Sequence, residues 1–457
     1  MNQETVTTGA VGVPPRLRRV LSLRDLIFYG LVLMQPIAPV GIFGFAQQMS
    51  HGHAVTTILI GMVAMMLTAL SYGRMAAVYP SAGSAYTYVG RELNLHLGFL
   101  VGWAMTLDYL MIPLINTVFG SLTLYHLAPQ IPYMVWVTLF IGVITFLNLR
   151  GIKSVANTNT VFLGIMTGVV LLFVALAVRY VAAMNGWAGV FSFAAFYDSR
   201  TFDLRSVTQA TSLAALTYVG FDSVTTLAEE VQDAKRTVPL ATVLICLLTG
   251  IYSAVEVYLA QLAWPDYLHF PSLETAFLDV TRRVGGTALF EAMGGVFILA
   301  CLGSGLAGQV GAARLLYGMG RDNVIPRRLF AHLDARRANP TFNIWLIAAL
   351  TLAGAWFLSY ERTAELLNFG AFLGYMGVNV ATIRRFHPRR GTPLAPALLA
   401  GVLAPGLGFA FCFAIWWGLA TPAKIMGGIW FAAGIIYSGI KTRGFRIPPR
   451  PLDFTEA

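Results

Sequence analysis

The chain has 457 residues, of which 57% are hydrophobic and 11% are charged, and its formal net charge is +10 at pH 7. Soluble domains carry roughly 25% charged residues, so this composition excludes a soluble globular protein. The positive charge does not predict nucleic-acid binding, because the Lys and Arg residues gather in alternate loops between long apolar segments. The composition therefore predicts a chain that crosses a lipid bilayer many times.

Apolar segments recur along the whole chain, and each is long enough to span the hydrocarbon core as a helix. Barrel strands would alternate apolar and polar residues, whereas the run from Gly168 to Leu176 is apolar on every side. The predicted spans lie near residues 25–48, 54–78, 95–127, 133–149, 157–182, 207–231, 238–263, 286–320, 342–359, 363–383, 396–419 and 423–441. The fold class is therefore an all-α polytopic membrane protein with about twelve transmembrane helices.

The distribution of positive charge predicts the orientation of the chain. Of the 31 Lys and Arg residues, we place seven in the loops on one side of the membrane, which leaves 24 on the side of the two termini. Cytoplasmic loops carry the excess of Lys and Arg. We therefore expect a protein of the cell membrane, inner or plasma, with cytoplasmic tails at residues 1–24 and 442–457.

The first predicted span is interrupted in its middle, which reads Gln35-Pro36-Ile37-Ala38-Pro39-Val40-Gly41. Each proline removes an amide donor, and its ring clashes with the preceding turn. Irregular backbone at this depth is tolerated only where it lines a cavity or is buried in protein. We therefore expect a broken helix here.

The sixth predicted span has a comparable defect, where Gly220 lies beside a carboxylate within the segment 217–222. Broken helices at matching positions in two halves are typical of transporters built from inverted repeats. Two ordinary kinks are the alternative, because Gly and Pro are common in membrane helices. The predicted units are a first repeat at 25–182, an extracytoplasmic loop at 183–206, a second repeat at 207–383 and two additional helices at 384–441.

Four passages along the chain carry a family resemblance. They are Tyr79–Tyr88, then Gly220-Phe221-Asp222 with Glu229-Glu230 and Lys235–Pro239, then Leu315–Asp322, and Leu107-Asp108-Tyr109 followed by Pro113. Together they resemble the amino acid, polyamine and organocation permease family, in particular its putrescine-importer-like branch. The resemblance implies a leucine-transporter-type fold with a five-plus-five inverted repeat, broken first and sixth helices, and alternating access.

The resemblance also implies that an organic amine or an amino acid binds between the first and sixth spans. The residues that we expect to bind it are Gln35, Ile37, Ala38, Gly41, Asp108, Tyr218, Phe221, Asp222 and Ser304. The rings of Tyr218 and Phe221 can hold an organic cation, although packing is an equally good interpretation. The small residues around Ser304 either enlarge the pocket or allow close helix packing.

Two carboxylates, Asp108 and Asp222, lie inside apolar spans, where each costs about 3 kcal/mol on an insertion scale. Pairing with a substrate ammonium is one reason for such a residue, and proton loading is another, because burial favours the protonated form. We predict proton coupling at Asp222, with capping of the broken helix as the alternative. Asp108 either serves the site or bonds to Tyr109 or nearby backbone. Glu256 and Glu291 match no motif, and we expect structural roles for them.

Charged residues at the cytoplasmic loop ends form a candidate gate. They are Glu229, Glu230, Arg236, Arg321 and Asp322. Opposite charges across that face would hold the cytoplasmic side closed in an outward-open state. Exposed charges with little energetic effect are the alternative.

The leading hypothesis is secondary active import of putrescine or a related polyamine, coupled to protons, because two intramembrane acids suit a dication. The second is a permease for a cationic or neutral amino acid, since half-helix amides can hold a carboxylate. A transporter-like membrane sensor is a third. A membrane aspartyl protease is disfavoured, because the Gly-x-Gly-Asp motif is absent, and no nucleotide-binding loop supports ATP-driven transport. We expect no enzyme activity, cofactor, metal or nucleic-acid partner.

Overall fold

Apolar helices make up the whole architecture. The computed structural model describes residues 19–273, 275–334, 338–387, 398–419 and 421–446. Within these residues the only strand-like pairing is an isolated bridge between Leu21 and Val231. The chain is therefore an all-helical membrane protein with many spans, as the composition predicts.

The first half of the chain begins with a helix that is broken near its middle. Its elements are α1 (Leu23–Met34), the 3-10 helix η1 (Ala38–Gly41), α2 (Phe43–Met49), α3 (Ala54–Val78), α4 (Ser84–Glu92), α5 (Leu95–Leu127), α6 (Tyr133–Leu149), α7 (Ile152–Val190) and η2 (Phe193–Ala195). The prediction of a break at residues 35–41 is confirmed, because α1 ends at Met34 and α2 begins only at Phe43.

The second half also begins with a broken segment, and the remaining helices follow it. Its elements are α8 (Leu204–Ala214), η3 (Ala215–Tyr218), α9 (Ser223–Thr226), η4 (Ala228–Glu230), α10 (Ala234–Ala263), α11 (Ala276–Arg321), α12 (Arg327–Phe330), α13 (Thr341–Phe357), α14 (Tyr360–Phe386), the π-helix η5 (Leu399–Leu403), α16 (Ala404–Trp417) and α17 (Thr421–Lys441). The sixth predicted span is therefore four short pieces rather than one helix.

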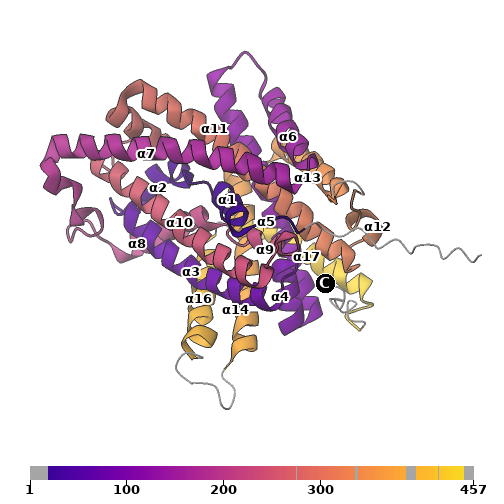
Figure 1. Ribbon diagram of the computed structural model, residues 1–457. Helices are drawn as coiled ribbons and strands as arrows, with labels where there is room; N and C mark the ends of the chain where they lie inside the picture. Colours follow the sequence, from indigo (N-terminus) through magenta and orange to yellow (C-terminus); the bar gives the residue numbers. More distant parts are fainter. Residues whose placement is uncertain (1–18, 274, 335–337, 388–397, 420, 447–457) are drawn as a thin grey trace, which may run out of the picture.

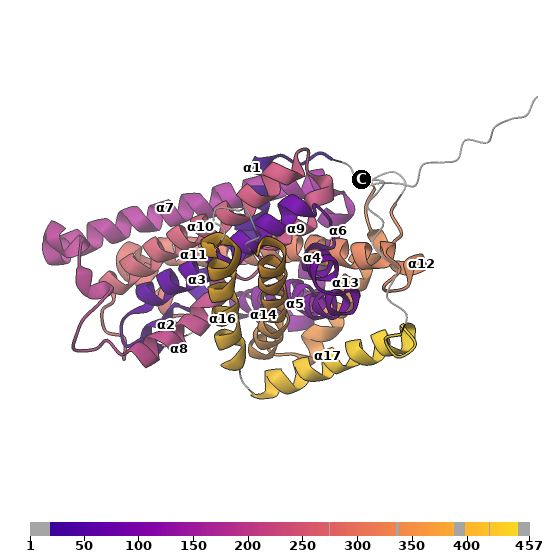
Figure 2. The same cartoon turned by 90° about the horizontal axis from the view of Figure 1, so that it is seen from below.

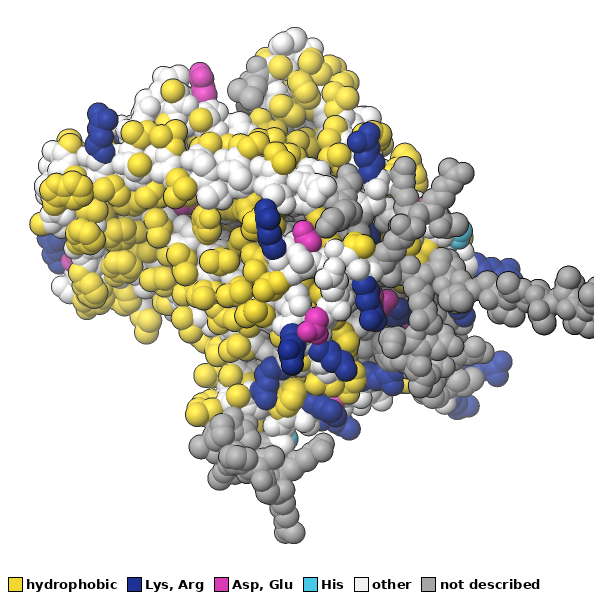
Figure 3. Space-filling model, viewed as in Figure 1, with side chains coloured by type: hydrophobic (Ala, Val, Ile, Leu, Met, Phe, Trp, Pro, Cys, Tyr) yellow, Lys and Arg dark blue, Asp and Glu magenta, His cyan; other side chains and the backbone are white. Residues whose placement is uncertain are grey.

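Nine helical segments in the described part of the chain are long and apolar enough to cross a membrane. The helices α6 and α13 are shorter and equally apolar. Large apolar side chains cover the outer faces, for example Leu171 of α7 and Ile436 of α17, which are both more than half exposed. Figure 3 shows this apolar surface as a broad band, with the visible Lys and Arg side chains gathered mainly toward the end of the molecule near α4.

Long helices surround the two broken segments. The helix α3 packs along α10, and α5 packs along both α11 and α14. Figure 1 shows α1 and α9 among these helices, and Figure 2 shows α17 at the edge of the bundle beyond α14. The breaks therefore lie inside protein, where irregular backbone is tolerated at membrane depth.

Two stretches in the first half of the chain differ from the sequence expectations. The segment 79–88, which the family resemblance assigns to a loop, enters a buried helix at Ser84. The helix α7 continues past its predicted end at residue 182 as far as Val190, across a kink at Gly186 with φ of 72°. The loop expected at 183–206 is correspondingly shorter.

Candidate functional site

The first break places an irregular turn at the end of α1. Gln35 follows the last residue of α1 with φ of 60°, in the left-handed region that few side chains adopt. The proline after it disfavours a helical conformation at residue 35. The chain then forms η1, in which the amides of Ala38 and Val40 donate to the carbonyls of Gln35 and Ile37 at 2.9 and 3.0 Å. The prolines thus convert one membrane helix into two short pieces joined by a tight turn.

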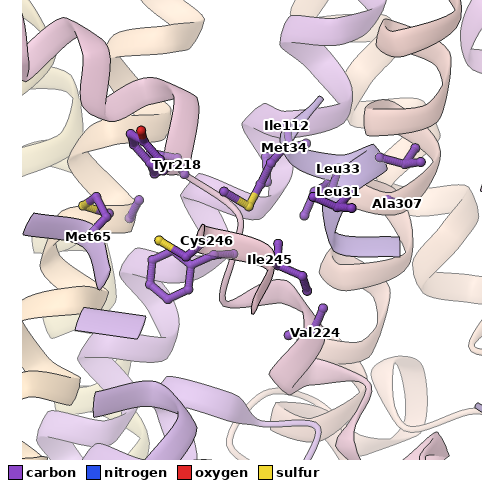
Figure 4. Packing of buried hydrophobic residues seen from close by; sticks show 14 of the residues in the cluster. Leu31, Leu33, Met34, Met65, Ile112, Tyr218, Val224, Ile245, Cys246 and Ala307 are labelled. Atoms are coloured by element: carbon purple, nitrogen blue, oxygen red, sulfur yellow. The ribbon is translucent and has the colours of Figure 1, made fainter. Parts of the chain in front are cut away.

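The second break depends on a glycine that lies against the first. Gly220 has φ of +104°, and a Cβ placed on it would lie 3.0 Å from Cδ2 of Leu33, at the end of α1. Any other residue would be strained by both the backbone angle and the contact. Figure 4 shows Leu33 and Met34 of α1 among buried side chains that include Tyr218 of η3. Two segments nearly two hundred residues apart in sequence therefore meet at the centre of the bundle.

A cavity of about 130 Å³ lies where the two breaks meet. Its walls come from the first break, from η3 and the residues after it, and from α5, α11 and α14. Four of the predicted substrate-binding residues line it: Gln35, Ala38, Gly41 and Ser304. No charged side chain is among the described residues that line the cavity. The pocket therefore offers carboxamide, hydroxyl and apolar groups to a ligand.

A chain of hydrogen bonds joins three helices along one wall of this cavity. Nε2 of Gln35 donates to Oδ1 of Asn116 at 2.6 Å, and Nδ2 of Asn116 donates to Oγ of Ser304 at 3.0 Å and to the carbonyl of Ile112 at 2.8 Å. The Ser304 hydroxyl donates in turn to the carbonyl of Leu33 at 2.6 Å. Asn116 was not predicted from the sequence, although a carboxamide inside the apolar helix α5 was a usable signal. The network fixes the end of α1 against α5 and α11.

Asp222 follows Val219, which lines this cavity, by three residues but does not line it, and its carboxylate is fully buried. Tyr109 of α5 donates to Oδ2 at 2.7 Å, and Tyr375 of α14 donates to Oδ1 at 3.0 Å. The Asp222 side chain makes no capping hydrogen bond to the short helix α9 that follows it. The two tyrosine hydroxyls, rather than helix amides, thus satisfy the buried carboxylate. The two tyrosines come from other spans, and sequence reasoning did not identify either as its partner.

Asp108 and Glu256 are also fully buried, in α5 and α10. None of their carboxylate oxygens has a hydrogen-bond partner within the described chain. Asp108 therefore does not bond to the Tyr109 hydroxyl, which is taken by Asp222. Glu291 lies on α11 and is exposed, whereas Asp108 and Glu256 are buried.

The remaining predicted substrate residues lie in the protein interior outside the cavity wall. Ile37 is fully buried, and the Tyr218 hydroxyl donates to the carbonyl of Ile58 at 2.9 Å. The Phe221 ring packs against the rings of Tyr72 and Tyr375, with centroids 5.5 and 5.1 Å apart. In this conformation both predicted aromatic residues therefore act in packing rather than presenting a face to the cavity.

Charged residues meet at the far end of α11. Arg321 contacts a carboxylate oxygen of Glu229 at 2.7 Å and one of Asp322 at 3.5 Å. Burial raises the pKa of the Asp322 carboxyl to about 6, with Arg321 opposing the shift and Glu229 adding to it. Oε1 of Glu229 also accepts the amide of Ala82 at 3.0 Å, which ties η4 to the turn before α4. Arg236 is exposed and takes no part in these pairs.

A second ion pair lies deeper in the protein than the first. Nε of Arg314 in α11 donates to Oε1 of Glu230 at 2.8 Å, and both side chains are about 2% exposed. The carbonyl of Glu230 accepts the amides of Val20 and Leu21, both at 2.9 Å, so the segment before α1 is attached to η4. Sequence reasoning placed Glu230 in a surface gate and missed Arg314. An arginine inside an apolar helix was the signal, because it needs a carboxylate partner.

Comparison with known proteins places this architecture among transporters. The model of the amino acid permease family matches residues 36–388. A low-affinity putrescine importer, PlaP of Escherichia coli (strain K12), is 34% identical over 435 residues, which cover 94% of this chain and 95% of that protein. The branched-chain amino acid permease BcaP of Lactococcus lactis is 26% identical, over 91% of this chain and 93% of its own. Cationic amino acid transporter 4 of Arabidopsis thaliana is 27% identical, over 84% of this chain and 66% of its own.

Proposed function

The chain belongs to the amino acid permease family, and from that premise we propose that it is a secondary active transporter that imports an organic amine by alternating access. Membership confirms the resemblance seen in the sequence and assigns the chain to membrane transporters rather than enzymes. Putrescine or a related polyamine is the first candidate substrate, because the importer PlaP is 34% identical over nearly the whole chain. A cationic or neutral amino acid is the second, because other relatives are permeases for amino acids.

The proposed fold has twelve spans arranged as a five-plus-five inverted repeat. The nine long segments, the two shorter apolar helices α6 and α13, and the broken stretch from α8 to η4 make up these spans. Residues 25–182 and 207–383 would form the two repeats, with α16 and α17 outside them. Support comes from the breaks, since each proposed repeat starts with one and the two lie in contact. Both termini would lie in the cytoplasm of the cell.

The observation that carries the transport proposal is the cavity between the two breaks, with Asp222 three residues beyond the cavity residue Val219. A small polar and apolar pocket at the centre of a membrane bundle is where an inverted-repeat transporter binds its substrate. An ammonium that enters from the cavity would compete with Tyr109 and Tyr375 for the Asp222 carboxylate. Asp108, which has no hydrogen-bond partner in the described chain, would then serve a second charge of a diamine.

Proton coupling and gating complete the proposal. Asp222 would carry the coupling proton, because it is buried, lies three residues after the cavity residue Val219, and accepts hydrogen bonds from two tyrosine hydroxyls that can rearrange. The ion pairs of Arg321 with Glu229 and of Arg314 with Glu230 would keep the cytoplasmic side closed while the cavity is open to the outside. Asp322 would support the first of these pairs.

The test is uptake by the purified full chain in proteoliposomes. Radiolabelled putrescine, spermidine, lysine and leucine would be supplied with and without an acid-outside pH gradient. We expect putrescine to accumulate, and the gradient to increase its accumulation at least tenfold. Failure of every amine to be carried or to compete would overturn the amine proposal. Saturable binding without any transport would favour a membrane sensor instead.

A further inference from the structure

A buried acid on α10 takes no part in the cavity wall or in the ion pairs at the end of α11. The side chain of Glu256 is fully buried, and neither of its carboxylate oxygens has a hydrogen-bond partner within the described chain. Burying an isolated ionised carboxylate is so costly that such a group becomes neutral instead. In these surroundings Glu256 is therefore stable only as the protonated carboxylic acid.

Glu256 lies on the side of α10 that faces α1. Gly30 of α1 packs against the Ile245 side chain, and the Thr249 hydroxyl donates to Sδ of Met34 at 3.9 Å. Both contacts advance by four residues in each helix, so α1 and α10 run in the same direction. Glu256 follows Ile245 by about three helical turns and Thr249 by about two, so the three residues share one side of α10.

At the level of Glu256, the chain of α1 has already reached the first break. The helix α1 ends at Met34, and η1, which also packs against α10, follows it. Glu256 lies about 10 Å along α10 from Thr249. The other end of α10 lies against η4, whose residues form the gate ion pairs. Glu256 therefore faces the first break, on the side of the cavity that the proposed topology assigns to the outside.

Two hydroxyl groups lie between Glu256 and the cavity on the same side of α10. Ser253 is fully buried, and its hydroxyl has no partner within the described chain. Thr249 lies one turn further along and contacts Met34, which is part of the cavity wall. A polar group thus occurs at each turn from the cavity to Glu256. Water in an open cavity can reach the acid along this line, just as outside water can reach it at an opened first break.

No charged group around this part of α10 pairs with Glu256 in the described chain. The elements η1 and α2 and residues 54–65 of α3 contain no titratable side chain. Those of the other elements packed against the outer half of α10 are Tyr29 of α1, His53 before α3, Arg179 and Tyr180 of α7, Tyr218 of η3, and Asp279, Arg282, Arg283 and Glu291 of α11. None of them bonds to Glu256. A proton is therefore the only neutralising partner that these surroundings leave.

We infer that Glu256 is a second proton-binding site of the transport cycle, so that an acid serves each of the two breaks. The inference rests on the proposed proton-coupled transport and extends it beyond Asp222. The Glu256 carboxylate takes a proton from water when the first break opens to the outside, and only the neutral acid is buried again as that side closes. It returns the proton to water when the cavity opens to the cytoplasm. The first break has no charged residue of its own, and α10 supplies one.

The test separates proton-driven accumulation from exchange of substrate. The unaltered full chain and Glu256→Gln are reconstituted in sodium-free proteoliposomes and assayed with labelled putrescine. Counterflow needs no ion gradient, whereas accumulation under an acid-outside gradient needs a working proton site. Glutamine has nearly the shape of protonated glutamate and cannot ionise. We therefore expect Glu256→Gln to keep counterflow within twofold of the unaltered protein and to lose gradient-driven accumulation at least tenfold.

Two matched variants control for shape and for net charge. Glu256→Asp keeps a carboxyl group at the site, so we expect accumulation within threefold of the unaltered protein. Glu291→Gln removes an exposed acid, and both assays should stay within twofold.

Three outcomes would overturn the inference and leave the transport proposal standing: accumulation retained in Glu256→Gln, counterflow lost in that variant together with accumulation, or an equally complete loss of accumulation in Glu256→Asp. Absence of counterflow in the unaltered protein would overturn the transport proposal. Counterflow without any response of the unaltered protein to the gradient would overturn proton coupling at both acids.

Discussion

The two breaks occupy matching places at the centre of the molecule, and their chemistry differs. The first break is made by prolines, has no charged residue and contributes Gln35 and Gly41 to the cavity wall. The second is made by a glycine with positive φ and leads directly to Asp222, which does not line the cavity and is hydrogen bonded by Tyr109 and Tyr375. Further along the same segment, Glu229 and Glu230 enter ion pairs. One break therefore shapes a neutral pocket, and the other brings the charges that a transport cycle can use.

This difference predicts which break responds to loss of charge. Asp222→Asn removes the carboxylate proposed to bind both the amine and the coupling proton, so we expect gradient-driven putrescine accumulation to fall at least a hundredfold. The measurement is uptake in proteoliposomes with and without an acid-outside gradient. If the variant still accumulates the amine under the gradient, coupling through Asp222 is wrong.

A matched control keeps this result specific to the second break. Glu291 lies on α11 and is exposed. Glu291→Gln removes one acid from the chain without touching either break, so we expect its accumulation to stay within twofold of the unaltered protein. An equal loss in both variants would mean that the charge of the chain matters rather than the position of Asp222.

The buried ion pair after the second break gives the largest expected effect on stability. Glu230→Gln leaves Arg314 charged and unpaired in the protein interior, which costs about 3 to 5 kcal/mol. We expect a large drop in the apparent melting temperature of the detergent-purified protein. In contrast, Arg362→Met breaks a half-exposed pair with Glu365 at 3.4 Å, and such pairs contribute at most about 1 kcal/mol. Similar shifts for the two variants would contradict the structural role of the buried pair.

The breaks also differ in how far they tolerate substitution. Gly220→Ala adds a Cβ 3.0 Å from Leu33 at a positive φ, and the strain and contact together cost about 3 kcal/mol. Alanine can adopt the backbone angle of Pro39, so Pro39→Ala acts mainly by raising the conformational entropy of the unfolded chain. We expect this to lower the free energy of unfolding by about 1 kcal/mol. Melting temperatures of the two variants should show the larger drop for Gly220→Ala. The reverse order would mean that the prolines, rather than the glycine, hold the breaks in contact.

Local features explain which parts of this arrangement were predictable. The breaks follow from Pro36, Pro39 and Gly220, whose effects on the backbone need no tertiary information. Burial of Asp108 and Asp222 follows from their apolar surroundings in sequence. The same reasoning predicted most helix positions, because a membrane helix has to be apolar over its whole length.

The partners in the site come from tertiary packing and were not accessible from local patterns. Asn116, Tyr109 and Tyr375 reach the breaks from α5 and α14, and one sequence does not specify which faces of those helices turn inward. For the same reason the rings of Tyr218 and Phe221 were expected at the substrate but lie in packing contacts. The groups that a ligand would meet at a broken segment therefore depend on side chains from helices that are distant in the sequence.

Asp322, beside the gate, gives the smallest predicted effect, and the effect depends on pH. Burial raises the pKa of its carboxyl from 3.8 to about 6, so the folded protein binds more protons than the unfolded chain between these values. Stability should therefore decrease as pH rises from about 4 to above 6, and a pKa shift of this size corresponds to about 2 to 3 kcal/mol. Asp322→Asn resembles the protonated form at every pH. We expect its melting temperature to equal that of the unaltered protein near pH 4 and to exceed it at pH 8, whereas a difference that is constant with pH would show that the Asp322 charge does not oppose folding.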